Sequence, residues 1–167
     1  MSPTAPRPPE FFIDRSLGRH QIAEELRARG WSVRTMSEVY GEEDAQRKED
    51  PPWLRDCGEG GLVVLTKDKA ILTPQPGGQP SPQIIAIQEA QTQVFLLMSQ
   101  SLSATEQAER FLRHERVIAN VVSSRVGPFV YGIFADAMRE VWPHRSDTRH
   151  RPEGRARSAG RHQRRRP

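Results

Sequence analysis

Three aspartates are placed where a folded chain could bring them together around a divalent cation. Asp14 follows the apolar segment 11–13, and Asp68 follows the apolar segment 62–66. Such segments form buried parallel strands when helices lie between them, and the carboxyl ends of parallel strands meet at one edge of the sheet. Asp50 lies between the two in sequence. Because Mg²⁺ and Mn²⁺ prefer oxygen ligands, the spacing predicts a metal site at that edge.

A site of this kind is suited to hydrolysing a phosphodiester. Carboxylates brought close together repel one another unless a cation neutralises them. A bound metal polarises a phosphoryl group and makes a water molecule acidic enough to attack near neutral pH. Arg15, Lys67 and Lys69 flank two of the aspartates, so we expect them to contact substrate phosphates.

Each aspartate also has a purely structural interpretation. Asp14 could cap a helix or start a turn, and Asp50 precedes two prolines, as a helix N-cap residue often does. Asp68 lies between Lys67 and Lys69 and could belong to an ordinary polar turn with solvated lysines. Only the combination of the three favours a site.

Hydrophobic periodicity and turn residues predict an alternation of strands and helices. Strands are expected at 11–14, 31–35, 62–66, 93–98 and 129–134, and helices at 16–29, 50–58, 83–90 and 104–122. Segment 37–49 is rich in charge and predicts an exposed loop or a loose helical turn. Proline and glycine predict a loop over 70–82. This order indicates an α/β fold in which helices cover both faces of a mainly parallel central sheet.

Composition divides the chain of 167 residues into one domain and two flanking segments. Residues 1–10 are proline-rich and expected to be disordered, 11–143 form the domain, and 144–167 form a basic disordered tail. Up to Pro143 there are 16 Lys and Arg against 19 Asp and Glu, whereas from His144 onward there are 9 against 2. The excess of positive charge therefore belongs to the tail, which we expect to add non-specific affinity for nucleic acid.

Several classes of function are disfavoured. The one cysteine, Cys57, excludes an internal disulfide and fits a reducing compartment. The chain has no apolar signal core and no apolar run near the ~20 residues that span a bilayer, so we expect a cytoplasmic protein without membrane contact. His20 and His114 have no partner at metal-ligand spacing, and the absence of a glycine-rich phosphate loop argues against a nucleotide-binding protein.

The order of these motifs resembles that of the PIN-like nucleases. Phe-Phe-Ile-Asp-Arg-Ser-Leu-Gly (11–18) is similar to their opening strand, which ends on the first acidic residue. Asp-Pro-Pro-Trp-Leu (50–54) and Gly-Leu-Val-Val-Leu-Thr-Lys-Asp-Lys (61–69) resemble their second half, where an Asp opens a helix and an apolar strand then delivers Thr-x-Asp. The resemblance extends over about 11–141 and is nearest to compact VapC-type toxins of toxin–antitoxin systems.

The resemblance implies an α/β/α sandwich with Mg²⁺- or Mn²⁺-dependent endoribonuclease activity. It also implies inhibition by a cognate antitoxin, RNA as the substrate, and a possible homodimer. Asp14, Asp50 and Asp68 then become the catalytic metal ligands by matching position. The family's further conserved glutamate has no clear counterpart in the short intervening segment, where the candidates for a fourth acid are Glu43 and Asp44, with Glu42 behind them. The alternative is a catalytically inactive PIN-like module that acts through protein or nucleic-acid contacts; metal dependence of RNA cleavage separates the two.

Overall fold

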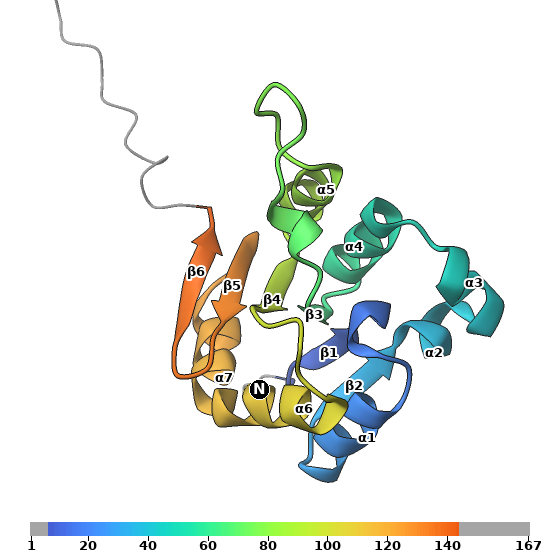
Figure 1. The fold of residues 1–167 in the computed structure, drawn as a ribbon, viewed down its shortest axis with the longest axis vertical. Helices are drawn as coiled ribbons and strands as arrows, with labels where there is room; N and C mark the ends of the chain where they lie inside the picture. Colours follow the sequence, from blue (N-terminus) through green and yellow to red (C-terminus); the bar gives the residue numbers. More distant parts are fainter. Residues whose placement is uncertain (1–6, 144–167) are drawn as a thin grey trace, which may run out of the picture.

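A six-stranded sheet forms the centre of the protein (Figure 1). The computed structural model describes residues 7–143. In spatial order the strands run β2-β1-β3-β4-β5-β6, and only β6 among them is antiparallel to its neighbour. Their bounds are β1 (Glu10–Ile13), β2 (Ser32–Thr35), β3 (Val63–Thr66), β4 (Gln93–Leu97), β5 (Phe129–Ile133) and β6 (Met138–Trp142).

Helices connect the strands and cover both faces of the sheet. The α-helices are α1 (Gln21–Ala28), α2 (Met36–Tyr40), α3 (Glu42–Arg47), α4 (Asp50–Glu59), α5 (Pro82–Ala90), α6 (Ala104–Arg113) and α7 (Glu115–Ser124). Two short 3-10 helices, η1 (Arg15–Leu17) and η2 (Lys69–Leu72), follow β1 and β3 directly. The predicted three-layer α/β/α sandwich with a mainly parallel sheet is therefore confirmed.

Alternation along each strand builds one apolar core on each face. In β1, Phe11 and Ile13 pack into the core beneath α1, α6 and α7, whereas Phe12 points into the core beneath α4 and α5. The Phe12 ring stacks on Trp53 of α4 with 5.3 Å between centroids. Residues buried on both sides explain why the central strands appear in the sequence as continuous apolar runs.

Three predicted elements differ from the structure. Segment 37–49, expected to be an exposed loop or a loose helical turn, contains most of α2 and all of α3, and a capping box between Thr35 and Glu38 starts α2. The single helix expected at 104–122 is divided at His114 into α6 and α7. Phe129–Ile133 is not the last strand, because β6 pairs with it across a tight turn.

The predicted domain limits remain a prediction, since residues 1–6 and 144–167 lie outside the described part of the chain. β1 begins at Glu10, one residue before the predicted start of the domain. The disorder and nucleic-acid affinity predicted for the basic tail concern residues beyond 143. Within residues 7–143, no helix has the length and apolar character of a bilayer-spanning segment.

Candidate active site

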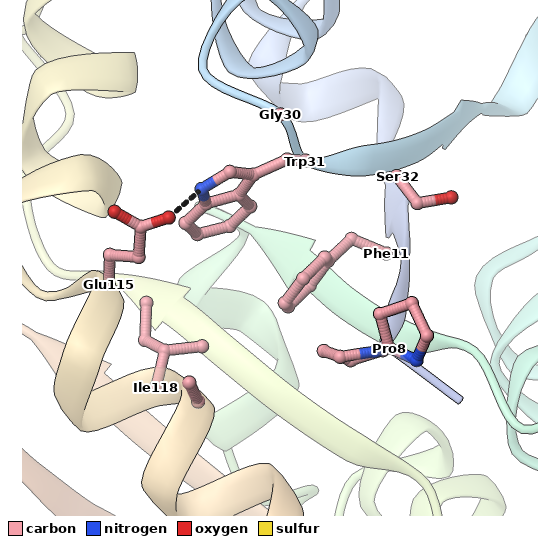
Figure 2. A pocket seen from close by; sticks show the side chains of 9 residues that line it. Pro8, Phe11, Gly30, Trp31, Ser32, Glu115 and Ile118 are labelled. Atoms are coloured by element: carbon pink, nitrogen blue, oxygen red, sulfur yellow. Dashed lines mark hydrogen bonds between the residues drawn. The ribbon is translucent and has the colours of Figure 1, made fainter. Parts of the chain in front are cut away.

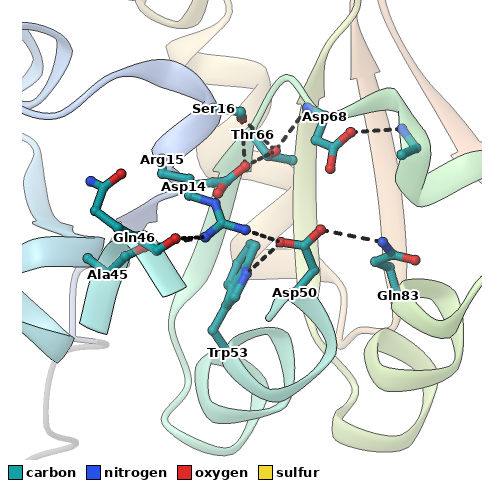
Figure 3. Close-up of polar contacts among 11 residues, drawn as sticks. Asp14, Arg15, Ser16, Ala45, Gln46, Asp50, Trp53, Thr66, Asp68 and Gln83 are labelled. Carbon is teal, nitrogen blue, oxygen red and sulfur yellow. Dashed lines mark hydrogen bonds and ion pairs between the residues drawn. The ribbon is translucent and has the colours of Figure 1, made fainter. Parts of the chain in front are cut away.

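The candidate site lies at the carboxyl ends of β1 and β3, where the strand order reverses. β2 lies on one side of β1 and β3 on the other, with Ile13 of β1 opposite Leu65 of β3. The Asp14 amide continues this register and donates to the Leu65 carbonyl at 3.0 Å. Open α/β sheets bind ligands at such reversal points, outside the carboxyl ends of the strands. Figure 3 shows that Asp14, Asp50 and Asp68 all face this region.

Two hydroxyl groups fix one oxygen of Asp14. Ser16 Oγ donates to Asp14 Oδ2 at 2.6 Å, and Thr66 Oγ1 donates to the same oxygen at 2.7 Å. The hydroxyls themselves accept from backbone amides, Ser16 from Lys67 and Thr66 from Asp68. Each hydroxyl has a single proton and donates it in a hydrogen bond to Asp14 Oδ2. The network therefore fixes Oδ2 as a hydrogen-bond acceptor.

The other oxygen of Asp14, Oδ1, is buried and has no hydrogen-bond partner among residues 7–143. The residue as a whole is 3% exposed. Burial raises the pKa of this carboxyl above its ordinary value of 3.8, the hydroxyl bonds from Ser16 and Thr66 oppose that rise, and the negative charge of Asp50 adds to it. A buried carboxylate oxygen without a donor is what a cation would satisfy.

Asp50 is the first residue of α4, and its carboxylate does not cap the helix. The N-cap residue is Glu49, so the structural interpretation of Asp50 as N-cap was wrong. Asp50 Oδ1 accepts from Arg15 at 3.3 Å and from the Trp53 indole at 3.2 Å, and Oδ2 accepts from Gln83 at 3.4 Å. The side chain therefore points back toward β1, near Asp14.

The structural interpretation of Asp68 as part of a polar turn is correct for one of its oxygens. Oδ1 accepts from the Ala70 amide at 2.9 Å and caps η2. The second oxygen of Asp68, Oδ2, makes no hydrogen bond within residues 7–143. Lys67 is half-buried and Lys69 is exposed, on either side of this aspartate. The turn therefore leaves one Asp68 oxygen available at the edge of the site.

The candidates for a fourth acid lie on α3, beside the site. Glu43 and Asp44 are exposed there. Glu42 is also exposed and lies 3.9 Å from both Arg19 and His20. Among the contacts of residues 7–143, no shared hydrogen-bond or ion-pair partner joins any of these three acids to Asp14, Asp50 or Asp68. Their part in the site therefore stays a prediction.

The arrangement suits a hard divalent cation held by few protein ligands. Within the described residues, no three His, Cys, Asp or Glu side chains lie close enough together to hold one metal ion. Asp50 is drawn toward Arg15, and Asp68 toward its own turn. Mg²⁺, however, is commonly bound through one or two carboxylates and completes its shell with water and phosphate oxygens. The unpartnered Asp14 Oδ1, with Asp50 close by, fits that requirement.

Four residues whose side chains contact the aspartates were not predicted as part of the site: Ser16, Trp53, Thr66 and Gln83. Ser16 and Thr66 carry a signal in the sequence, since each is a hydroxyl residue within two positions of a candidate acid. Gln83 carries none, because its distance from Asp50 depends on how α5 packs against α4.

Other reactive groups in the described chain have structural explanations. Cys57 is buried, and its surroundings raise the pKa of the thiol, so it is a poor nucleophile. His114 is buried at the junction of α6 and α7. A cavity of about 240 Å³ opens at the opposite, amino end of β1 and β2, where the Trp31 indole donates to Glu115 at 2.9 Å (Figure 2). Its lining is mainly apolar and holds no cluster of acids.

Two comparisons with known proteins found similarities. Residues 9–99 match the family model described as a PIN like domain, a span that includes Asp14, Asp50 and Asp68. The chain is 29% identical over 123 residues to a protein of Mycobacterium tuberculosis (strain ATCC 25618 / H37Rv) named "Putative ribonuclease VapC45", an alignment that covers 74% of this chain and 84% of that protein. No solved structure matches the chain significantly.

Proposed function

This chain belongs to the PIN-like domain family, and from that premise we propose that it is a metal-dependent endoribonuclease that hydrolyses RNA phosphodiester bonds. The observation that supports this most directly is the buried Asp14 carboxylate, which two hydroxyls orient and whose second oxygen has no partner in the described part of the chain. The relative named as a ribonuclease supports RNA as the substrate class.

In this proposal Asp14 and Asp50 hold Mg²⁺ or Mn²⁺ together with water and phosphate oxygens, and Asp68, which the described residues do not place within the same cluster, joins them as the third ligand when the metal binds. The metal, when bound, polarises the scissile phosphate and acidifies an attacking water. Ser16 and Thr66 hold Asp14 in the orientation that exposes Oδ1. Glu43 and Asp44 are the candidates for a fourth acid, because α3 lies beside the site.

Basic side chains at the rim are proposed to hold the substrate. Lys67 and Lys69 flank Asp68, and Arg15 follows Asp14, so all three are sequence neighbours of a candidate ligand. Positive charge at these positions counteracts repulsion between RNA phosphates and the aspartates. Further elements of the proposal are that the protein is the toxin of a toxin–antitoxin pair, that a cognate antitoxin inhibits it, and that it forms a homodimer.

The test is cleavage of end-labelled RNA by the purified full chain with Mn²⁺ or Mg²⁺, and with EDTA. Cleavage should require the metal, and Asp14→Asn and Asp68→Asn should each abolish it. Asp136→Asn is the matched control, because Asp136 is exposed on the turn before β6, where it pairs with Arg113. Metal-independent cleavage, or cleavage that survives both variants, would contradict the proposal. Absence of cleavage with RNA binding retained would favour the inactive binding module.

A further inference from the structure

The guanidinium of Arg15 joins the candidate metal site to α3. Nη2 donates to Asp50 Oδ1 at 3.3 Å, and Nη1 donates to the Gln46 carbonyl at 3.2 Å and to the Ala45 carbonyl at 3.4 Å. Figure 3 shows the planar group lying between the Asp50 carboxylate and the end of α3. One side chain thus contacts a charged ligand candidate and two carbonyl dipoles.

Arg15 supplies the positive charge that Asp50 otherwise lacks. The other donors to Asp50 are the neutral indole of Trp53 and the neutral amide of Gln83. Within residues 7–143, Arg15 is the one cation within ion-pair distance of Asp50. Because Asp14 carries a second negative charge nearby, the guanidinium relieves repulsion between the two carboxylates when no metal is bound.

We propose that Arg15 is an internal counter-cation that a divalent metal must displace from Asp50 in order to bind. The inference rests on the proposed metal site and adds a regulatory step to it. Arg15 and the metal compete for the Asp50 carboxylate, so Arg15 lowers the metal affinity of the protein. The same side chain is then released for the phosphate-binding role proposed above.

The geometry suits exchange rather than a permanent ion pair. The contact to Asp50 is long for a charge-assisted hydrogen bond, and the side chains are 37% (Arg15) and 24% (Asp50) exposed. Ion pairs with this exposure are weak because water screens them. Arginine is suited to the role, since its fork can bind a carboxylate and backbone carbonyls at once, which a lysine ammonium cannot do in the same geometry.

The first experiment is calorimetric titration of the metal-free full chain with Mn²⁺. Arg15→Gln should bind Mn²⁺ at least about fivefold more tightly than the wild type, because the competing charge is gone. Arg19→Gln is the matched control: it removes one positive charge four positions farther along the chain, where the ion-pair partner is Glu42, and its affinity should stay within about twofold of the wild type. An equal gain in both variants would reduce the effect to net charge and overturn the inference.

A second measurement needs no substitution. In the ¹⁵N-labelled wild type, titration with diamagnetic Mg²⁺ should shift the guanidinium signal of Arg15 and increase its side-chain rotation as the site fills. An unchanged Arg15 signal at saturating Mg²⁺, or Arg15→Gln binding Mn²⁺ no better than the wild type, overturns the inference while the metal site stands. If the wild type binds no metal at all, the proposed function fails and the inference fails with it.

Discussion

Replacing the buried Asp14 by asparagine should make the metal-free protein more stable. In the wild type the carboxylate is held by Ser16 and Thr66, but Oδ1 is buried without a donor from any described residue, next to the negative charge of Asp50. Asparagine keeps the shape and an acceptor for the two hydroxyls, and it removes the buried charge. A metal reverses the comparison, because only the carboxylate gains a strong ligand interaction.

The size of the effect follows from the cost of an unsatisfied buried polar group, about 1–3 kcal/mol. The asparagine amide keeps part of that cost, since its NH₂ then lies where Oδ1 had no partner. We therefore expect a gain of about 1.5 kcal/mol, which raises the melting temperature of a domain of this length by about 5 °C. Mn²⁺ at a hundred times its Kd should stabilise the wild type by about 2.7 kcal/mol and leave the variant unchanged.

The gain should also depend on pH in a defined direction. The pKa of Asp14 is raised in the folded state above its ordinary value of 3.8. The unfolded chain therefore loses this proton first, so stability falls as pH rises from below 3.8 through the raised folded pKa. The Asp14→Asn variant has no such proton, so its advantage should be present at neutral pH and disappear below the ordinary pKa of the aspartate.

Thermal unfolding followed by circular dichroism measures the stability gain in EDTA and the stabilisation by Mn²⁺. Repeating the EDTA measurement from below pH 3.8 to neutral pH gives the pH dependence. Asp136→Asn serves as the control for loss of one negative charge, and because Asp136 is exposed it should stay within about 0.5 kcal/mol of the wild type. A folded Asp14→Asn protein that melts below the wild type in EDTA would refute the argument from buried charge. Equal stabilisation of both proteins by Mn²⁺ would remove Asp14 from the metal site.

Three further outcomes are expected. Gly58→Ala should destabilise the protein by more than about 2 kcal/mol in urea unfolding, because the added Cβ would lie 2.4 Å from Thr92 Oγ1 and 2.5 Å from the Ala90 carbonyl. A loss under about 0.5 kcal/mol would show that α4 and α5 can separate easily. Ser103→Ala should cost about 1 kcal/mol through loss of the capping box of α6, and calorimetry would contradict this if the melting temperature did not fall. Deletion of 144–167 should lower the salt dependence of RNA binding and leave the cleavage pattern unchanged, whereas an unchanged salt slope would exclude the tail from binding.

The strands that form the centre of the sheet were predictable because both of their faces are buried. β3 and β4 therefore appear as continuous apolar runs, and the position of Asp68 after β3 follows from that pattern. β6 did not give such a signal, since Met138–Trp142 alternates only weakly and is half-buried at the sheet edge. Its pairing with β5 depends on the tight turn, in which the Phe134 amide donates to the Ala137 carbonyl.

The missed helices were determined by tertiary packing more than by composition. α2 and α3 each bury one residue, Met36 and Ala45, so no apolar stripe marks them among the charged residues. The Thr35-x-x-Glu38 capping box was a start signal that the charge pattern obscured. No glycine or proline lies near His114 to mark the division between α6 and α7. The sequence alone therefore predicts one continuous helix there.

For the candidate site, the positions of the aspartates at the strand ends were predictable, but the partners of their side chains were not. Strand ends place Asp14 and Asp68 at one edge, as the apolar runs indicate. The pairing of Arg15 with Asp50 spans 35 positions and depends on the path of α3 between them. The prediction that three carboxylates share one ion stays a prediction, because in the described chain only Asp14 has a wholly unpartnered buried oxygen near a second acid.

Every side chain proposed for the chemistry lies between Asp14 and Gln83, within the span 9–99 that matches the family. The remaining segment supplies α6, α7, β5 and β6, whose contribution to that edge is packing. Substitutions on the exposed faces of α6 and α7 therefore leave every proposed ligand in place, provided that the apolar contacts of β4 and β5 persist. Among relatives that share the proposed chemistry, we expect the sequence to diverge fastest on these helix faces.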